Sequence, residues 1–178
     1  MTTDYATFLE TKRRTAQAVG PLVSRDDLVS SLFDWQQALT RWSVRKGRAA
    51  LFCDCGLGKT PMQLAWAEAI GERTLILAPL CVAEQTVREG HKFHVPVHYA
   101  TDMASIGSHR IVITNYERLD KFDVSAFGAV VLDESSILKS FDGKTRTKLI
   151  ETFAHTRFKL CCTATPAPND IAELANHA

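Results

Sequence analysis

The chain contains 178 residues, of which 46% are hydrophobic and 23% are charged, a composition ordinary for one globular domain. A chain of this length buries about 70% of the surface of its unfolded form, so intrinsic disorder is a poor description of it. Because 21 Lys and Arg residues balance 20 Asp and Glu residues, the net charge is only +1, and any nucleic-acid binding must use a local basic surface.

The N-terminal segment is charged and lacks an apolar core, which excludes an ordinary secretory signal peptide. No apolar run approaches the roughly 18 residues of a membrane span. The five cysteines lack the CxxC spacing of zinc sites, so we expect small buried thiols in a reducing cytoplasm. A weak helical pattern over 5–19 ends at Gly20 and Pro21. We therefore interpret residues 1–30 as a peripheral helical segment and residues 31–178 as the main domain.

A second helix is expected to begin at Asp34, a suitable N-cap residue, and to end at Gly47. Its apolar residues recur at helical spacing, which predicts that this face packs against a sheet. They are Trp35, Ala38, Leu39 and Trp42.

Short apolar runs then alternate with segments of helical length. Continuous hydrophobicity is typical of parallel strands that helices cover on both faces. The repeated β-α-β-α order predicts an α/β fold with a doubly wound, mostly parallel sheet. The expected strands are 49–53, 74–78, 110–114, 129–133 and 158–163, and the expected helices between them are 61–70, 82–93 and 144–155.

The strongest signal is a glycine-rich turn between the first strand and its helix. Its glycines let successive backbone N–H groups face one anion, and the N-terminus of the following helix adds its positive end. In such a phosphate loop, Lys59 reaches the β and γ phosphates of a nucleoside triphosphate and the Thr60 hydroxyl is a ligand of Mg²⁺. Cys53 stands where the pattern GxxxxGK[ST] has glycine, a slight departure. The expected nucleotide-binding residues are Asp54, Cys55, Gly56, Leu57, Gly58, Lys59 and Thr60.

Two acids, Asp133 and Glu134, follow the strand predicted over 129–133. Ligands of open parallel sheets bind at the carboxyl ends of strands, so these acids are expected beside the phosphate loop. We expect Asp133 to hold Mg²⁺ and Glu134 to orient the water that attacks the γ phosphate, with Lys59 completing the catalytic set. A helix N-cap pair is the alternative interpretation.

Two hydroxyls, those of Thr163 and Thr165, follow the last predicted strand. Bonded to the acidic pair, either hydroxyl would relay the presence of the γ phosphate to the rest of the domain. Ordinary turn capping explains isolated threonines equally well.

Six segments in this order resemble the first, RecA-like motor domain of superfamily 2 helicases of the DEAD/DEAH-box type, and most closely the Swi/Snf-like helicases of phages and prophages. Segment 32–36 looks like the adenine-recognition segment of that family, whereas the other five are similar to its motifs I, Ia, Ib, II and III. These five are 54–60, 77–80, 114–117, 133–136 and 163–166.

The resemblance implies roles for further residues. Gln36 would read the adenine edge, although without the resemblance it reads as a polar residue on an amphipathic helix. Ser136, with Thr163 and Thr165, would couple ATP to nucleic acid. Better-known members of the family carry His or Asp at the position of Ser136, and a hydroxyl lacks that charge. Cys55 replaces a usual methionine. The residues implied for the nucleic-acid face are Pro79, Leu80, Thr114 and Asn115.

The family carries a second RecA-like domain with motifs IV to VI, and this sequence ends just after motif III. An arginine finger contributes about 10³- to 10⁵-fold to hydrolysis, so we expect this chain to bind ATP–Mg²⁺ and to hydrolyse it weakly alone. The expected partners are that second domain and a nucleic acid, DNA by resemblance, with no membrane. The expected location is the cytoplasm of a bacterial host. The oligomeric state is left open.

The hypothesis for function is therefore a DNA-dependent ATPase, either a helicase or a translocase, that hydrolyses ATP to ADP and phosphate. A nucleotide-gated module that binds DNA or protein without turnover is the alternative from another class. A small-molecule kinase with a phosphate loop is disfavoured because the sequence has no lid or acceptor signature.

Overall fold

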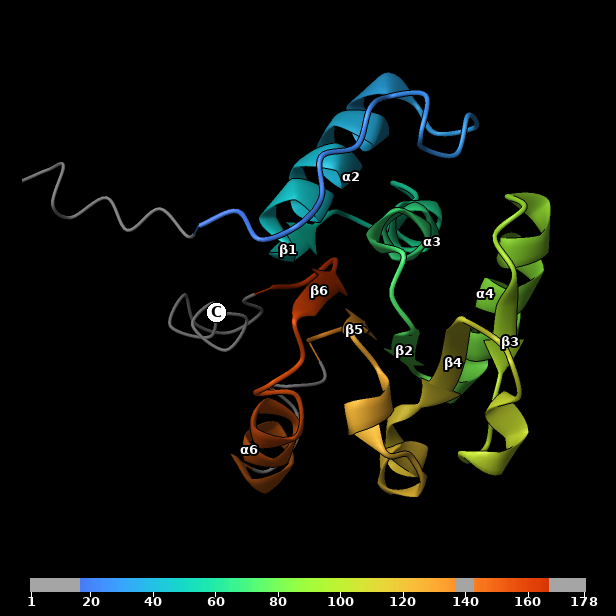
Figure 1. Ribbon diagram of the computed structural model, residues 1–178, viewed down its shortest axis with the longest axis vertical. Helices are drawn as coiled ribbons and strands as arrows, with labels where there is room; N and C mark the ends of the chain where they lie inside the picture. Colours follow the sequence, from blue (N-terminus) through green and yellow to red (C-terminus); the bar gives the residue numbers. More distant parts are fainter. Residues whose placement is uncertain (1–16, 137–142, 167–178) are drawn as a thin grey trace, which may run out of the picture.

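The computed structural model describes residues 17–136 and 143–166, and it contains one six-stranded sheet in which every strand pair is parallel (Figure 1). The strand order is β1-β6-β5-β2-β4-β3. The expected parallel α/β sheet is confirmed; three of the five predicted strands match their expected bounds, and the other two are shifted by one residue. The strands are β1 Arg48–Phe52, β2 Thr74–Ala78, β3 Val97–Tyr99, β4 Ile111–Asn115, β5 Ala129–Asp133 and β6 Phe158–Thr163.

Strand β3 was missed by the sequence analysis. It is three residues long and has His98 at its centre, so it presents no continuous apolar run. Its position at the edge of the sheet is set by pairing with β4, where Val97 stands opposite Ile111. Pairing with a formed neighbour stabilises a strand whose own sequence is a weak signal.

Helices cover both faces of the sheet, as a doubly wound fold requires. One buried cluster joins Ile76 of β2 to residues of the helices α2, α3 and α4, and a second cluster, which contains Leu75 and Leu77, includes Leu149 of α6. Figure 1 shows α6 on the opposite side of the sheet from α2 and α3. No helix in the described ranges is long and apolar enough to cross a membrane. The α-helices are α2 Asp34–Lys46, α3 Lys59–Ile70, α4 Leu80–Lys92 and α6 Gly143–Thr152, and the short 3-10 helices are η1 Ala104–Ile106, η2 Tyr116–Lys121 and η3 Val124–Ala126.

Helix α2 differs from its prediction in its cap and in its buried face. Phe33, not Asp34, is the N-cap residue, and its N–H donates to Gln36 Oε1 at 2.9 Å. Trp35 and Trp42 are 42% and 48% exposed. The buried face is mostly polar, so apolar spacing alone indicated the wrong face. Its residues are Gln36, Gln37, Thr40, Ser43 and Val44.

The predicted N-terminal helix over 5–19 lies outside the described residues as far as residue 16, and residues 17–19 are not helical. The segment that follows runs along α2. Gly20 N donates to Arg45 O at 3.2 Å, and the Arg41 guanidinium donates to Val23 O at 3.1 Å. Leu28 is buried. Residues 20–30 thus pack on the domain, whereas the boundary at residue 30 stays a prediction.

The fit of this segment can be tested by Gly20→Ala. An added Cβ would collide with Val44 O of α2, so the backbone must separate from the helix. We expect the unfolding free energy to fall by about 1–3 kcal/mol in urea denaturation, the cost of overpacking a filled site. Leu22→Ala is the control, because this exposed side chain should change stability by less than about 0.5 kcal/mol. Equal effects of the two substitutions would contradict the described packing.

Candidate functional site

The two strongest sequence signals leave the sheet at the same edge. Strand β6 lies between β1 and β5, and its Cys162 stands in register with Leu51 on one side and Asp133 on the other. Since all three strands are parallel, the loop after β1 and the acids after β5 emerge at one level. The expected convergence of the phosphate loop and the acidic pair is therefore present in the fold.

A cleft of about 560 Å³ opens where these segments meet. The loop and the start of α3 form one wall, the acids form the floor, and α4 contributes a third side. The cleft brings Lys59, Thr60, Asp133 and Glu134 together, as the sequence predicted. Its lining residues are Cys55, Gly56, Gly58, Lys59, Thr60, Pro61, Val82, Gln85, Glu89, Asp133 and Glu134.

The loop has the geometry of an anion cradle. Gly56 and Gly58 adopt φ values of 79° and 73°, a left-handed conformation that glycine tolerates best. Gly58 is the N-cap of α3 and supplies no side-chain hydrogen bond, and the first turn of α3 carries no acid. The first N–H groups of this helix are thus left to an anion. Lys59 Nζ donates to Cys53 O at 3.1 Å and to Asp54 O at 3.3 Å, which holds its charge at the loop.

Gln36 contacts the loop instead of pointing to solvent. Its side-chain nitrogen Nε2 donates to Leu57 O at 3.0 Å, while its Oε1 accepts from the N–H of Phe33. One amide therefore caps α2 and holds the phosphate loop. The predicted contact of Gln36 with adenine stays a prediction.

Asp133 is 5% exposed, and its carboxylate is held by two donors. Gln63 Nε2 donates to Asp133 Oδ1 at 2.6 Å, and the Glu134 N–H donates to the same oxygen at 3.1 Å. Burial raises the pKa of Asp133 and the nearby Glu134 carboxylate raises it further, whereas the bond from Gln63 and the Lys59 charge lower it. The second carboxylate oxygen is not used by either of these bonds.

Glu134 has φ = 50°, an uncommon conformation for a side chain larger than glycine. Its carboxylate Oε2 lies 3.5 Å from Thr163 Oγ1, and this hydroxyl accepts from the N–H of Thr165 at 3.1 Å. The threonines thus lie next to the acidic pair, while their relay role stays a prediction. Ser136 is half-buried in the turn after β5, and its coupling role also stays a prediction.

The residues implied for nucleic-acid binding divide into two groups. Leu80 is 58% exposed at the start of α4, and Pro79 is half-buried before it. Thr114 and Asn115 are buried at the end of β4, so their side chains do not reach the surface. Next to them, the Tyr116 hydroxyl donates to Asp133 O at 2.7 Å, and burial raises the pKa of this phenol well above its usual value. The segment resembling motif Ib therefore contacts the acidic pair directly.

Besides Pro61, which directly follows Thr60, sequence reasoning missed four residues of the site: Gln63, Val82, Gln85 and Glu89. Gln63 lies three residues after Thr60, so helical spacing places it on the same face of α3, a signal that could have identified it. The other three line the cleft from α4, and Gln85 Nε2 donates to Glu89 Oε1 at 3.0 Å. No local motif marks them, because their position depends on how α4 packs beside α3.

The expectation of buried thiols is only partly met. Cys53 and Cys162 are buried and Cys161 is half-buried, but Cys55 in the loop and Cys81 at the start of α4 are exposed. Burial raises the pKa of Cys161 to about 11. The two exposed thiols stand near the cleft and next to Leu80, respectively.

Two curated proteins are similar to most of this chain, whereas no protein-family model matches it. The SWI/SNF-related matrix-associated actin-dependent regulator of chromatin subfamily A-like protein 1 of Drosophila melanogaster is 27% identical over 163 residues. Protein p41 of Acyrthosiphon pisum secondary endosymbiont phage 1 is 30% identical over 159 residues. These alignments cover 83% and 74% of this chain but only 21% and 35% of the relatives, so the chain spans a minor part of their length.

Solved structures share the fold. The Sulfolobus solfataricus SWI2/SNF2 ATPase core, solved in complex with dsDNA, superposes with a TM-score of 0.70 at 21% identity and covers 88% of this chain and 37% of that chain. The UvsW helicase from bacteriophage T4 gives a TM-score of 0.67 at 14% identity over 99% of this chain and 66% of that chain. At such identities the likeness establishes the fold.

The loop geometry predicts different outcomes for its two glycines. Both alanine variants bear the strain of a left-handed residue, about 1–2 kcal/mol. Gly56 has no atom within 4 Å of an added Cβ, whereas a Cβ on Gly58 would collide with the Gln36 amide. We expect Gly58→Ala to lower the unfolding free energy by about 1 kcal/mol more than Gly56→Ala in urea denaturation. Adding Gln36→Ala to Gly58→Ala should remove this excess, and additive effects in that double-mutant cycle would contradict the contact.

Proposed function

Since the chain has the RecA-like fold of superfamily 2 helicase motor domains, with Swi/Snf-like and phage relatives, we propose that it is the ATP–Mg²⁺-binding motor domain of a DNA-dependent ATPase. The resemblance to Swi/Snf-like phage helicases that the six motifs predicted is confirmed by these relatives. In this proposal, the partner domains decide whether the whole protein separates strands or translocates along DNA.

One observation carries the proposal: the glycine-rich loop and the acidic pair face a single cleft. The loop offers unpartnered helix N–H groups and the Lys59 ammonium, which together suit the β and γ phosphates. On the other side of the same cleft, Asp133 and Glu134 are carboxylates, which suit a cation and a water molecule. The alternative interpretation of these two acids, a helix N-cap pair, would not require them to face the phosphate loop.

The residues present fit Mg²⁺. The Thr60 hydroxyl and the Asp133 carboxylate, both oxygen ligands, line the same cleft, and the buried Gln63 Oε1 has no hydrogen-bond partner among the described residues. No group of three or more His, Cys, Asp and Glu residues in the described ranges forms a metal cage. Mg²⁺ typically uses one or two protein ligands together with substrate phosphates and water. When bound, it would neutralise charge on the phosphates, with Gln63 fixing the orientation of Asp133.

The proposed reaction is hydrolysis of the bond between the β and γ phosphates of ATP. Glu134 orients a water molecule, accepts its proton as the oxygen bonds to the γ phosphorus, and ADP leaves with the bridging oxygen. Lys59 neutralises charge on the β and γ phosphates. Turnover by this chain alone should be slow, since the family resemblance places an arginine finger in a second motor domain and that residue contributes about 10³- to 10⁵-fold.

DNA is the proposed nucleic acid because the Sulfolobus ATPase core with the same fold was solved in complex with dsDNA. Among the predicted strand-binding residues, Leu80 at the start of α4 is exposed and accessible to DNA. The buried Tyr116 hydroxyl, bonded to Asp133 O, offers a direct path from the segment resembling motif Ib to the acids.

Two substitutions separate a motor from a nucleotide-gated binding module. Lys59→Ala should weaken ATP–Mg²⁺ binding by about 10- to 100-fold in calorimetry, because a charge-assisted phosphate contact of about 1.5–3 kcal/mol is lost. Glu134→Gln should bind ATP with little change, and its turnover in the full-length protein should fall by about 10²- to 10⁴-fold. Undiminished turnover of Glu134→Gln would contradict the assigned role, whereas a wild-type protein that binds ATP without any turnover would favour the binding module.

The two exposed thiols test nucleotide and DNA contacts in the unmodified chain. Cys55 lines the cleft and Cys81 follows Leu80, so each reports on one surface. ATP–Mg²⁺ should slow alkylation of Cys55 by about tenfold or more without affecting Cys81, since a bound phosphate covers the loop. DNA should slow alkylation of Cys81. Mass spectrometry of peptides after timed labelling measures both rates, and equal Cys55 rates with and without nucleotide would contradict the nucleotide site.

A further inference from the structure

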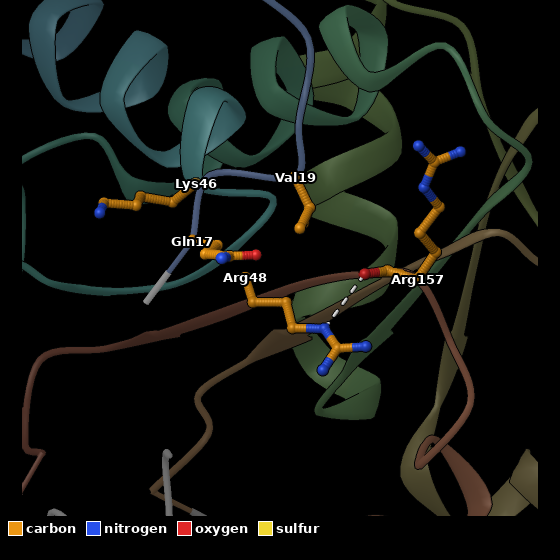
Figure 2. A pocket seen from close by; sticks show the side chains of 5 residues that line it. All are labelled: Gln17, Val19, Lys46, Arg48 and Arg157. Carbon is orange, nitrogen blue, oxygen red and sulfur yellow. Dashed lines mark hydrogen bonds between the residues drawn. The ribbon is translucent and has the colours of Figure 1, made fainter. Parts of the chain in front are cut away.

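A basic cavity lies at the edge of the sheet opposite the nucleotide cleft. We call its three cations, Lys46, Arg48 and Arg157, the basic edge; with Gln17 and Val19 they line a cavity of about 470 Å³ (Figure 2). Lys46 ends α2, Arg48 begins β1, and Arg157 directly precedes β6. In a parallel sheet the amino ends of β1 and β6 face away from the loop and the acids. The basic edge is thus separate from the site already described.

The arginines are held in place without neutralising partners. Arg48 donates through Nε to Arg157 O at 3.2 Å and through Nη2 to Thr156 O at 3.5 Å. The guanidinium carbon of Arg157 lies 4.8 Å from the centroid of the Phe158 ring. Neither arginine forms an ion pair with an acid among the described residues. Their charges are therefore available to a ligand.

The electrostatic environment of Arg48 also favours an anionic ligand. Burial lowers the pKa of Lys159, and repulsion from Arg48 lowers it further. In a chain whose net charge is +1, this crowding of cations is a local excess. A negatively charged ligand at this edge would relieve the repulsion.

The shape of the basic edge favours an extended polyanion. In Figure 2 the charged ends of Lys46, Arg48 and Arg157 point in different directions, so one small anion cannot contact all three. Four of the five described residues that line the cavity carry polar or charged side chains, and Val19 is apolar, whereas protein interfaces have an apolar core. Interfaces with nucleic acid are more polar and strongly positive. A chain of phosphates matches the spread of the three cations.

We propose that the basic edge binds the phosphate backbone of DNA, as a second contact surface on the side of the domain opposite the nucleotide cleft. This inference deepens the proposed function, because it rests on DNA being the nucleic acid. It does not depend on nucleotide binding. DNA that contacts this edge in addition to the segments near Leu80 would follow the side of the domain and bind it over a longer path.

The test measures binding of a fluorescein-labelled DNA duplex to the 178-residue chain by anisotropy, over about 50–200 mM salt. The double variant Arg48→Gln/Arg157→Gln should bind about tenfold more weakly at low salt, and the slope of log K against log salt should become shallower by about one to two, because up to two phosphate contacts are lost. A matched double variant, Arg88→Gln/Lys92→Gln, removes the same charge from α4 near the far edge of the sheet and should keep the wild-type slope. Equal slopes for the two double variants would overturn the proposal.

Three further measurements separate charge from folding, DNA from protein, and the basic edge from the nucleotide site. Arg48→Lys/Arg157→Lys keeps both charges and should retain most of the affinity; a loss as large as that of the Gln variant, with a lowered unfolding midpoint, would show that these arginines serve folding and would overturn the proposal. Poly-glutamate should compete poorly with the duplex, and competition as strong as that of DNA at equal charge would point to an acidic protein instead.

Calorimetry with ATP–Mg²⁺ should give unchanged binding for the Gln variant, whereas absence of ATP binding by the wild-type chain would refute the nucleotide site and leave this result standing.

Discussion

The candidate site depends on the parallel pairing of β6 with β1 on one side and with β5 on the other. Because Cys162 is in register with both Leu51 and Asp133, the loop that follows β1 and the acids that end β5 leave the sheet at one level. A shift of β5 against β6 by one residue would turn the side chain of Asp133 to the other face of the sheet. The register of three apolar strands thus decides whether the charged groups meet.

Around this register the fold buries a small polar network. A carboxylate as buried as that of Asp133 is costly unless donors surround it, and Gln63 and the backbone N–H of Glu134 provide them. Tyr116 binds the carbonyl oxygen of the same residue from the neighbouring loop. Contacts from α3 and from the segment after β4 thus fix Asp133, the residue to which the proposed function assigns the cation. Small displacements within this buried network would then couple the proposed sites to one another.

Helix α2 shows how the region outside the sheet serves the same site. Its Gln36 side chain caps the helix and bonds to Leu57 of the loop, and the helix packs against α3. Residues 20–30 run along the outer side of α2. Helix α2, with residues 20–30 packed on it, therefore supports the phosphate loop from outside the sheet.

The sequence by itself determined the parallel α/β class, five of the six strands, the glycine-rich loop and the acidic pair, because continuous apolar runs and the spacing of glycine, lysine and acids are local properties of the chain. It did not determine the buried face of α2, where the exposed Trp35 and Trp42 were expected inside, nor the existence of β3, which pairing with β4 stabilises. The contributions of Glu89 and of the cations at the amino ends of β1 and β6 also required the tertiary structure. Each arises between residues far apart in sequence, and only the packing of helices on a defined strand order brings such residues together.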